Sequence, residues 1–174
     1  MGSTQACLRN IFWRYATALW HFGAPKLVIV DEPTAGLDPD ERNRFLNLLS
    51  EIGENVVVIL STHIVADVTD LCPRMAMIGK GEVLMQGAPQ TAIDTLKNKI
   101  WRKSVTKTEL PEYQKQFKVL TTRLVGGKPQ INVFADSQPD DGFKLVEPDL
   151  EDVYFLQLRA SQQSTMPSAS AVTR

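Results

Sequence analysis

Two short apolar runs constrain the fold of this chain more than any other feature. "KLVIV" and "NVVVIL" are strand-sized and rich in β-branched residues, a pattern typical of parallel strands covered on both faces. Between them, "DPDERNRFLNLLSEIGE" has the spacing of an amphipathic helix that ends at Gly53. Its apolar face consists of Phe45, Leu48, Leu49 and Ile52. Strand, helix and strand in this order predict a parallel sheet with a right-handed crossover, and so an α/β fold.

The rest of the chain has a different texture. A short helix, "IVADVTDLC", follows the second strand, and "RMAMIGKGEVLMQG" then predicts a hairpin. "APQTAIDTLKNKIWRK" has a helical pattern, and "FKVLTTRLVGGKPQINVFAD" predicts a second hairpin with its turn at Gly126-Gly127-Lys128-Pro129. "EPDLEDVYFLQL" is typical of a closing helix. The final "RASQQSTMPSASAVTR" has almost nothing to bury, so we expect it to be disordered.

Composition limits the range of functions. Of the 174 residues, 43% are hydrophobic, and 19 basic against 20 acidic residues give a formal net charge of −1. This balance gives no general reason to expect nucleic-acid binding. No apolar run approaches the roughly 20 residues that span a bilayer, and the N-terminus does not have the pattern of a secretory leader. Cys7 and Cys72 match no metal or redox spacing, so we expect reduced thiols and a cytoplasmic location.

Acidic side chains follow the first apolar run. Asp31 and Glu32 come directly after the strand, and Asp38 follows in a turn-rich loop. Ligands bind parallel sheets at the carboxyl ends of the strands, where one carboxylate can hold a hydrated Mg²⁺. A neighbouring carboxylate points elsewhere and can polarise a water for attack on a phosphoanhydride. The alternative interpretation is a plain polar strand end, which charged loops often provide.

The second strand ends in polar residues as well. Ser61, Thr62 and His63 follow "VVVIL", and they lie beside the acids if the two strands are neighbours. A histidine here can contact a phosphate or orient the attacking water. A single histidine at a strand end is more often an ordinary surface residue. The convergence of two strand ends on one chemistry favours the functional interpretation.

Together, "LVIVDEPTAGLDP" and "VVVILSTHI" closely resemble the ATP-binding subunit of ABC-type transporters. The resemblance implies that Asp31, in the Walker B strand, binds Mg²⁺ and that Glu32 is the general base. It implies that Asp38, in the D-loop, lies at a dimer interface and belongs to the cofactor-binding residues with Asp31 and His63. It also implies that His63 is the switch residue sensing the γ-phosphate. The implied cofactors are ATP and Mg²⁺. The implied partners are a membrane-spanning subunit and a second ATP-binding subunit, at the inner face of the cell membrane.

The resemblance implies the C-terminal part of a P-loop NTPase domain of the ABC type, exporter-like, with a small α+β appendage. The hairpin after His63 and the "EPDLEDVYFLQL" segment resemble the corresponding parts of exporter-type members. We therefore predict four segments. They are a poorly matching N-terminal segment (1–22), the ATPase core (23–100), an accessory region (101–159) and a disordered tail (160–174).

The chain also departs from the family pattern. Its 174 residues contain no Gly-x-x-x-x-Gly-Lys-Ser/Thr loop, whose backbone N–H groups hold the phosphates in this fold. Where the signature motif Leu-Ser-Gly-Gly is expected, the chain has Cys7-Leu8-Arg9-Asn10. We therefore expect an N-terminally truncated or altered domain that binds ATP poorly and hydrolyses it negligibly by itself.

Two other functions remain open from the sequence. One is a partner-binding module without turnover, and the other is the ATPase head of a DNA-maintenance protein, where the same motifs recur. The basic stretch "LKNKIWRKSVTK" around Trp101 can contact anionic lipid, although a solvated face with a core tryptophan is the simpler interpretation. Asp136, Asp140 and Asp141 are more typical of turn formers than of metal ligands.

Overall fold

The computed structural model describes residues 25–164. The predictions for residues 1–24, including the altered signature motif, lie outside the described residues. The chain forms two compact units, with the boundary between Leu71 and Cys72.

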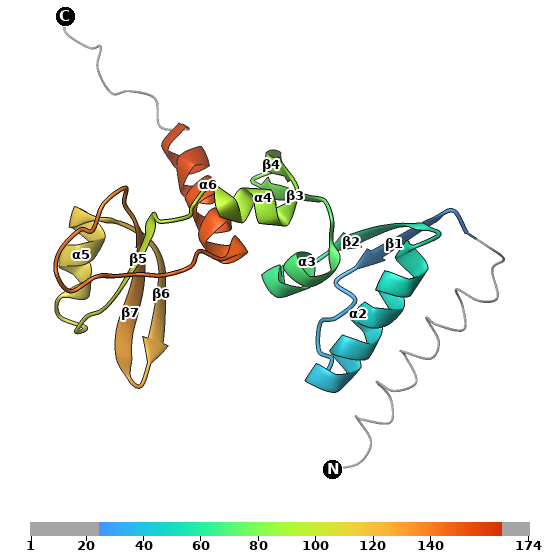
Figure 1. Ribbon diagram of the computed structural model, residues 1–174, viewed down its shortest axis with the longest axis horizontal. Coiled ribbons are helices and arrows are strands. Elements are labelled where there is room, and N and C mark those ends of the chain that lie inside the picture. The colour runs from blue at the N-terminus through green and yellow to red at the C-terminus, as the bar shows by residue number, and fades with distance from the viewer. Residues whose placement is uncertain (1–24, 165–174) are drawn as a thin grey trace, which may run out of the picture. The chain divides into compact units, whose positions relative to one another are not determined.

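The first unit is a βαβα segment (Figure 1). Its elements are β1 (Leu27–Asp31), α2 (Pro39–Gly53), β2 (Val57–Ser61) and α3 (Val65–Leu71). Strands β1 and β2 pair in parallel, in a register that runs from Leu27 opposite Val57 to Asp31 opposite Ser61. The strand, helix, strand and helix predicted from the sequence are confirmed in this order.

Helix α2 packs its apolar side chains against the sheet of this unit. Phe45, Leu46 and Leu49 are buried, and the helix ends at Gly53 as predicted. Of the expected apolar face, Leu48 and Ile52 are only partly buried. The helix contacts β2, so its apolar stripe covers one face of the two-stranded sheet.

The prediction that both strands are covered on both faces is wrong for the described part of the chain. Val28 is buried, but its neighbour Ile29 is 67% exposed. Leu27, on the same strand, is 49% exposed, and on the paired strand Val57 is 62% and Ile59 50% exposed. Successive side chains of a strand point to opposite faces, and within residues 25–71 the helical layer lies on one face. The strands therefore alternate between exposed positions and positions that are buried or partly buried.

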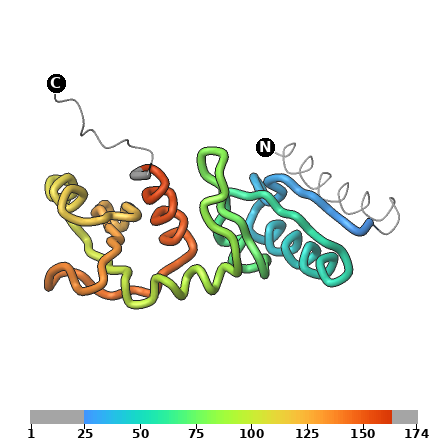
Figure 2. The backbone as a smooth tube through the Cα atoms, turned by 90° about the horizontal axis from the view of Figure 1, so that it is seen from above, coloured from blue at the N-terminus to red at the C-terminus, as the bar shows by residue number. Residues whose placement is uncertain are grey.

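The second unit begins with an antiparallel hairpin and ends with a long helix (Figure 2). Its first elements are β3 (Met75–Gly79), β4 (Glu82–Gly87) and α4 (Pro89–Asp94). The hairpin turns at Lys80 and Gly81, both with positive φ, as the predicted Gly-Lys-Gly turn requires. Its remaining elements are β5 (Ile100–Ser104), α5 (Leu110–Gln116), β6 (Lys118–Val125), β7 (Lys128–Phe134), β8 (Lys144–Leu145) and α6 (Leu150–Ser164).

The predicted helix over "APQTAIDTLKNKIWRK" is wrong beyond Asp94. Helix α4 ends there, and after a turn in which Asn98 has a φ of 61° the chain enters strand β5. Asparagine tolerates this left-handed backbone better than most residues. Strand β5 pairs with both β7 and β8, so cross-strand pairing overrides the local helical pattern.

The core of the second unit lies against a four-stranded sheet with the strand order β6-β7-β5-β8. Hairpin β6–β7 turns at Gly126 and Gly127, which are the first two residues of the predicted turn. Lys128 and Pro129, also predicted in the turn, instead begin strand β7, where they pair with Val125 and Leu124. Aromatic rings and aliphatic side chains pack together beside the sheet. The buried members of this cluster are Val105, Val119, Ile131, Val133 and Phe143.

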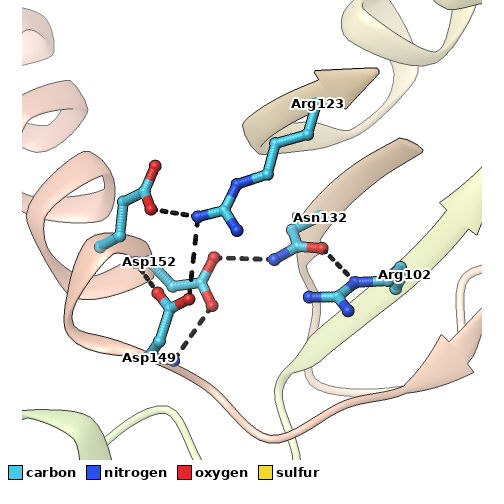
Figure 3. Close-up of polar contacts among 6 residues, drawn as sticks. Arg102, Arg123, Asn132, Asp149 and Asp152 are labelled. Atoms are coloured by element: carbon cyan, nitrogen blue, oxygen red, sulfur yellow. Dashed lines mark hydrogen bonds and ion pairs between the residues drawn. The ribbon is translucent and has the colours of Figure 1, made fainter. Parts of the chain in front are cut away.

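Helix α6 is tied to the sheet by a polar network (Figure 3). Asp149 and Asp152 each accept a hydrogen bond from the other's backbone N–H, a reciprocal cap that begins the helix. Asp152 also accepts from the Asn132 side chain at 3.0 Å, and Arg102 donates to Asn132 at 2.9 Å. The helix continues to Ser164, into the segment predicted as a disordered tail. Residues 165–174 lie outside the described range.

Within residues 25–164, no helix is long and apolar enough to cross a membrane.

Candidate functional site

The carboxyl ends of β1 and β2 bring the predicted site residues together. Asp31 lies opposite Ser61 in the register, and the Ser61 hydroxyl donates to the Asp31 carboxylate. The ladder continues one residue further, because the Glu32 N–H donates to the Ser61 carbonyl at 2.9 Å. The two strand ends are thus held side by side.

Glu32 turns the chain away from the strand. Its φ is 45°, a left-handed conformation that is uncommon for a residue with a side chain and often occurs at functional sites. This turn separates the direction of the Glu32 carboxylate from that of Asp31. Glu32 Oε2 lies 2.7 Å from Nδ1 of His63, so the two predicted catalytic residues are in direct contact.

The contact between Glu32 and His63 is accessible from outside. The Glu32 side chain is 37% exposed and the His63 side chain 75% exposed. With a proton on Nδ1, the ring donates to the carboxylate, and Nε2 faces away from this hydrogen bond. A carboxylate and an imidazole held in this way can polarise a water and contact an anionic oxygen at the same time.

Asp38 has a different local role from the other predicted site residues. It is the N-cap of α2, and its side chain accepts from the Glu41 N–H at 2.8 Å. The cap satisfies one of the unpaired N–H groups at the helix start. Among residues 25–164, no hydrogen bond or ion pair joins Asp38 to Asp31, Glu32 or His63. Its predicted place at a dimer interface stays a prediction.

Sequence reasoning missed a buried polar group beneath these loops. Asp67, on α3, is fully buried, and Thr34 Oγ1 donates to its Oδ2 at 2.5 Å. Arg42, near the start of α2, donates from Nε to Asp67 Oδ1 at 2.6 Å. An acid in the first turn of a helix is ordinary in a sequence, so no local signal marked Asp67 as buried.

The basic stretch around Trp101 is largely paired with acids. Lys97 lies 2.9 Å from Asp94, and Lys103 lies 2.7 Å from Asp140. Burial opposes the charge of Lys103, but hydrogen bonds from its ammonium to Asp140 and Tyr113 outweigh that effect and raise its pKa. Trp101 is half-buried in β5 and donates from its indole to the carbonyl of Ala135. This arrangement favours the structural interpretation of the stretch over lipid binding.

The acid-rich loop after β7 also has a structural role. Asp140 accepts from the Gly142 N–H at 2.7 Å, which is the turn-forming contact predicted for this loop. Within residues 25–164, no group of three or more histidine, cysteine or acidic side chains is placed to hold a metal ion.

Asp31 is nevertheless chemically suited to Mg²⁺. It provides a carboxylate beside the Ser61 hydroxyl, both of them oxygen donors. Mg²⁺ usually takes one or two carboxylates and completes its shell with water and substrate phosphates. The donor set at the strand ends therefore fits a metal that arrives with a phosphorylated ligand.

Comparisons with known proteins match part of this chain. A family model described as "AAA domain, putative AbiEii toxin, Type IV TA system" matches residues 9–66. The uncharacterized ABC transporter ATP-binding protein YdbJ of Bacillus subtilis is 43% identical over 82 residues, which cover 44% of this chain and 26% of YdbJ. The energy-coupling factor transporter ATP-binding protein EcfA2 of Enterococcus faecalis is 35% identical over 38% of this chain and 24% of its own length.

A third relative and two solved structures match similar shares of this chain. The Nod factor export ATP-binding protein I of Mesorhizobium japonicum is 37% identical over 40% of this chain and 21% of its own length. An ATP-binding subunit of an ABC transporter aligns with a TM-score of 0.38 and 30% identity, over 41% of this chain and 30% of that one. CbiO1 of Clostridium perfringens aligns with a TM-score of 0.37 and 36% identity, over 40% and 29%.

Over the matched segment, this chain is similar to the ATP-binding proteins of ABC transporters. The resemblance expected from the strand-end motifs is confirmed for that part of the chain, and so is the mixed α/β fold class. The match spans about a quarter of the length of these curated relatives, 21% to 26%.

Proposed function

We propose that this chain supplies the metal- and water-positioning part of an ABC-type ATPase site. Asp31 would hold Mg²⁺ and Glu32 would act as the general base on the attacking water. His63 would contact the γ-phosphate. The observation that carries the proposal is the 2.7 Å contact between Glu32 and His63, beside Asp31, at the ends of two paired parallel strands.

We further propose that the site serves transport through a separate membrane subunit, with a second ATP-binding subunit across a dimer interface near Asp38. The support is the relatives' identity as transporter ATP-binding proteins, one of them named for export. Mg²⁺ would supply charge neutralisation for the phosphates, and the chain's own residues would orient the water and accept its proton.

The phosphate-holding loop is not among these 174 residues. Backbone N–H groups of that loop provide much of the nucleotide affinity in this fold. We therefore propose that the chain by itself binds ATP weakly and hydrolyses it at a rate near background. Turnover by the purified chain that Glu32→Gln abolishes would overturn this part of the proposal.

The metal site can be tested without turnover. Mn²⁺, added to the ¹⁵N-labelled chain, should broaden the amide signals of residues 31, 32 and 61–63 before all others. Asp31→Asn should abolish this selectivity. Asp40→Asn changes an exposed acid of α2 and should leave the broadening unchanged. Equal broadening at all surface acids, or no effect of Asp31→Asn, would contradict the proposed metal site.

The transport role calls for a separate test. We expect the coding sequence next to this chain to include a membrane protein that co-purifies with it when the two are expressed together. The double variant Asp31→Asn and Glu32→Gln should retain the association, because neither side chain is assigned to the membrane subunit. Adjacent frames without a membrane protein, together with tight DNA binding, would favour the ATPase head of a DNA-maintenance protein instead.

A further inference from the structure

The buried group of Thr34, Arg42 and Asp67 connects the parts of the first unit that carry the site. Thr34 lies in the loop between Glu32 and Asp38, Arg42 in α2, and Asp67 in the helix that follows His63. A single carboxylate thus joins the loop after β1, the crossover helix and the segment after β2.

The contacts of Asp67 are short and enclosed. Its exposure is 0%, and that of Thr34 is 2%. Oδ2 accepts from the Thr34 hydroxyl at 2.5 Å, while Oδ1 accepts from Arg42 Nε at 2.6 Å. Arg42 Nη2, itself buried, lies 2.5 Å from the same oxygen. A buried carboxylate is tolerated only when it is paired and hydrogen-bonded in this way.

The contact between Glu32 and His63 contributes little stability by itself. Glu32 and His63 are both exposed, and exposed ion pairs or hydrogen bonds between mobile side chains contribute little to stability. Their distance must therefore be set largely by the backbone of the two loops. Thr34 lies two residues beyond Glu32, and Asp67 lies four beyond His63.

We propose that Asp67 is a positioning residue for the Glu32–His63 pair and acts through its bond to Thr34. With both loops fastened to one carboxylate, the general base and the phosphate-contacting histidine stay at hydrogen-bond distance before any nucleotide arrives. Such preorganisation lowers the cost of assembling a catalytic site. This inference rests on the proposed function, because it assigns a purpose to the distance between Glu32 and His63.

The test reads the ring nitrogen signals of His63 by NMR in the full chain, with no nucleotide present. His63→Gln assigns the signals against those of His21, the other histidine. Glu32→Ala provides the reference for a ring that has lost its carboxylate partner. Thr34→Val removes the hydroxyl and keeps the shape of the side chain, and Thr34→Ser restores the hydroxyl.

We expect Thr34→Val and Asp67→Ala to move the His63 signals most of the way to the Glu32→Ala reference. Thr34→Ser should return them to the wild-type position. The matched control is Thr69→Val, because Thr69 is an exposed residue of α3 whose hydroxyl donates only to the Val65 carbonyl of its own helix. It should leave the signals unchanged.

A purely structural role for Asp67 predicts a different result. In that case Thr34→Val lowers thermal stability but leaves the His63 signals at their wild-type position in the folded protein, and the proposal is overturned. The proposal is also overturned if the His63 signals of the wild-type protein already match those of Glu32→Ala. If Asp67→Ala does not fold, Thr34→Val and Thr34→Ser decide. Since neither nucleotide nor metal is used, failure to bind Mn²⁺ would count against the proposed function and not against this result.

Discussion

The two units of this protein differ in how far the apolar side chains of their strands are buried. In the first unit, Ile29 and Val57 expose most of their surface, although they lie in the most apolar runs of the chain. In the second unit, Ile131 and Val133 are fully buried, although their strand, β7, has a less apolar sequence. Strand burial is therefore decided by the layers available to cover a sheet, and apolar composition alone does not ensure it.

Exposed and buried polar pairs have different roles, and the first unit contains both kinds, since its Thr34–Asp67 pair is buried. In the first unit, Glu32 and His63 meet at exposed strand ends, where a ligand can reach them. In the second unit, Asp152 and Asn132 are buried and bond to each other and to the start of α6. Accessible polar pairs are suited to chemistry, whereas enclosed ones fasten elements together.

The largest expected effect is in the core of the second unit. Ile131→Ala should lower the free energy of unfolding of that unit by about 2–5 kcal/mol, because it leaves a cavity at a fully buried site. The matched change in the first unit, Ile59→Ala, should cost less than about 0.5 kcal/mol, because Ile59 is exposed. Amide hydrogen exchange measures each unit separately, and equal losses in the two would break the comparison.

A smaller effect is expected at the start of α2. Asp38→Ala should destabilise the first unit by about 1 kcal/mol, since it removes the cap on the Glu41 N–H. Asp38→Ser retains a capping oxygen and should recover most of the loss. Exchange rates of the amides in the first turn of α2 report the change. Unchanged rates in Asp38→Ala would show that the cap contributes nothing to the unit.

A pH-dependent effect is expected in the second unit. Burial raises the pKa of Asp152, so its folded-state pKa lies above the unfolded value of about 3.9. Between these two values the folded state binds more protons than the unfolded state, and stability therefore falls as pH rises. Asp152→Asn should flatten this slope, while Asp141→Asn, at an exposed acid, should not. Urea midpoints followed through the β5–β7 amides from pH 4 to pH 7 measure it.

The smallest effect on stability is expected at the exposed apolar face of the first unit. Ile29→Thr should change the free energy of unfolding by less than about 0.5 kcal/mol but reduce the binding of a hydrophobic dye, because it removes exposed apolar surface. Val28→Thr, at the buried neighbour, is the contrasting control and should destabilise the unit. Equal dye binding before and after Ile29→Thr would indicate that this face is covered in solution.

Several elements could be predicted from the sequence because they depend on local chemistry. The Gly-Lys-Gly and Gly-Gly turns, the end of α2 at Gly53 and the βαβ order all follow from residues close together in the chain. The approach of Glu32 to His63 was also predictable, because paired parallel strands of known direction end at the same edge of the sheet.

Other elements depended on partners far away in the sequence. Strand β5 has a helical local pattern, and its pairing with β7 and β8 made it a strand. Helix α5 and strand β8 carry too little apolar periodicity to be recognised alone. Residue spacing could not reveal that Asp67 is buried, since the bonds to Thr34 and Arg42 exist only after the loops and helices have packed.

The sequence by itself determined the α/β order of the first unit, the family resemblance and the identity of Asp31, Glu32 and His63 as site candidates. The element order and the site candidates follow from periodicity and from residue types at strand ends, and the resemblance rests on two short motifs; all of these are local properties. The tertiary structure alone decided which apolar side chains are covered and which acid is buried beneath the loops. Burial depends on the layer that packs against a residue, and that layer is drawn from distant parts of the chain.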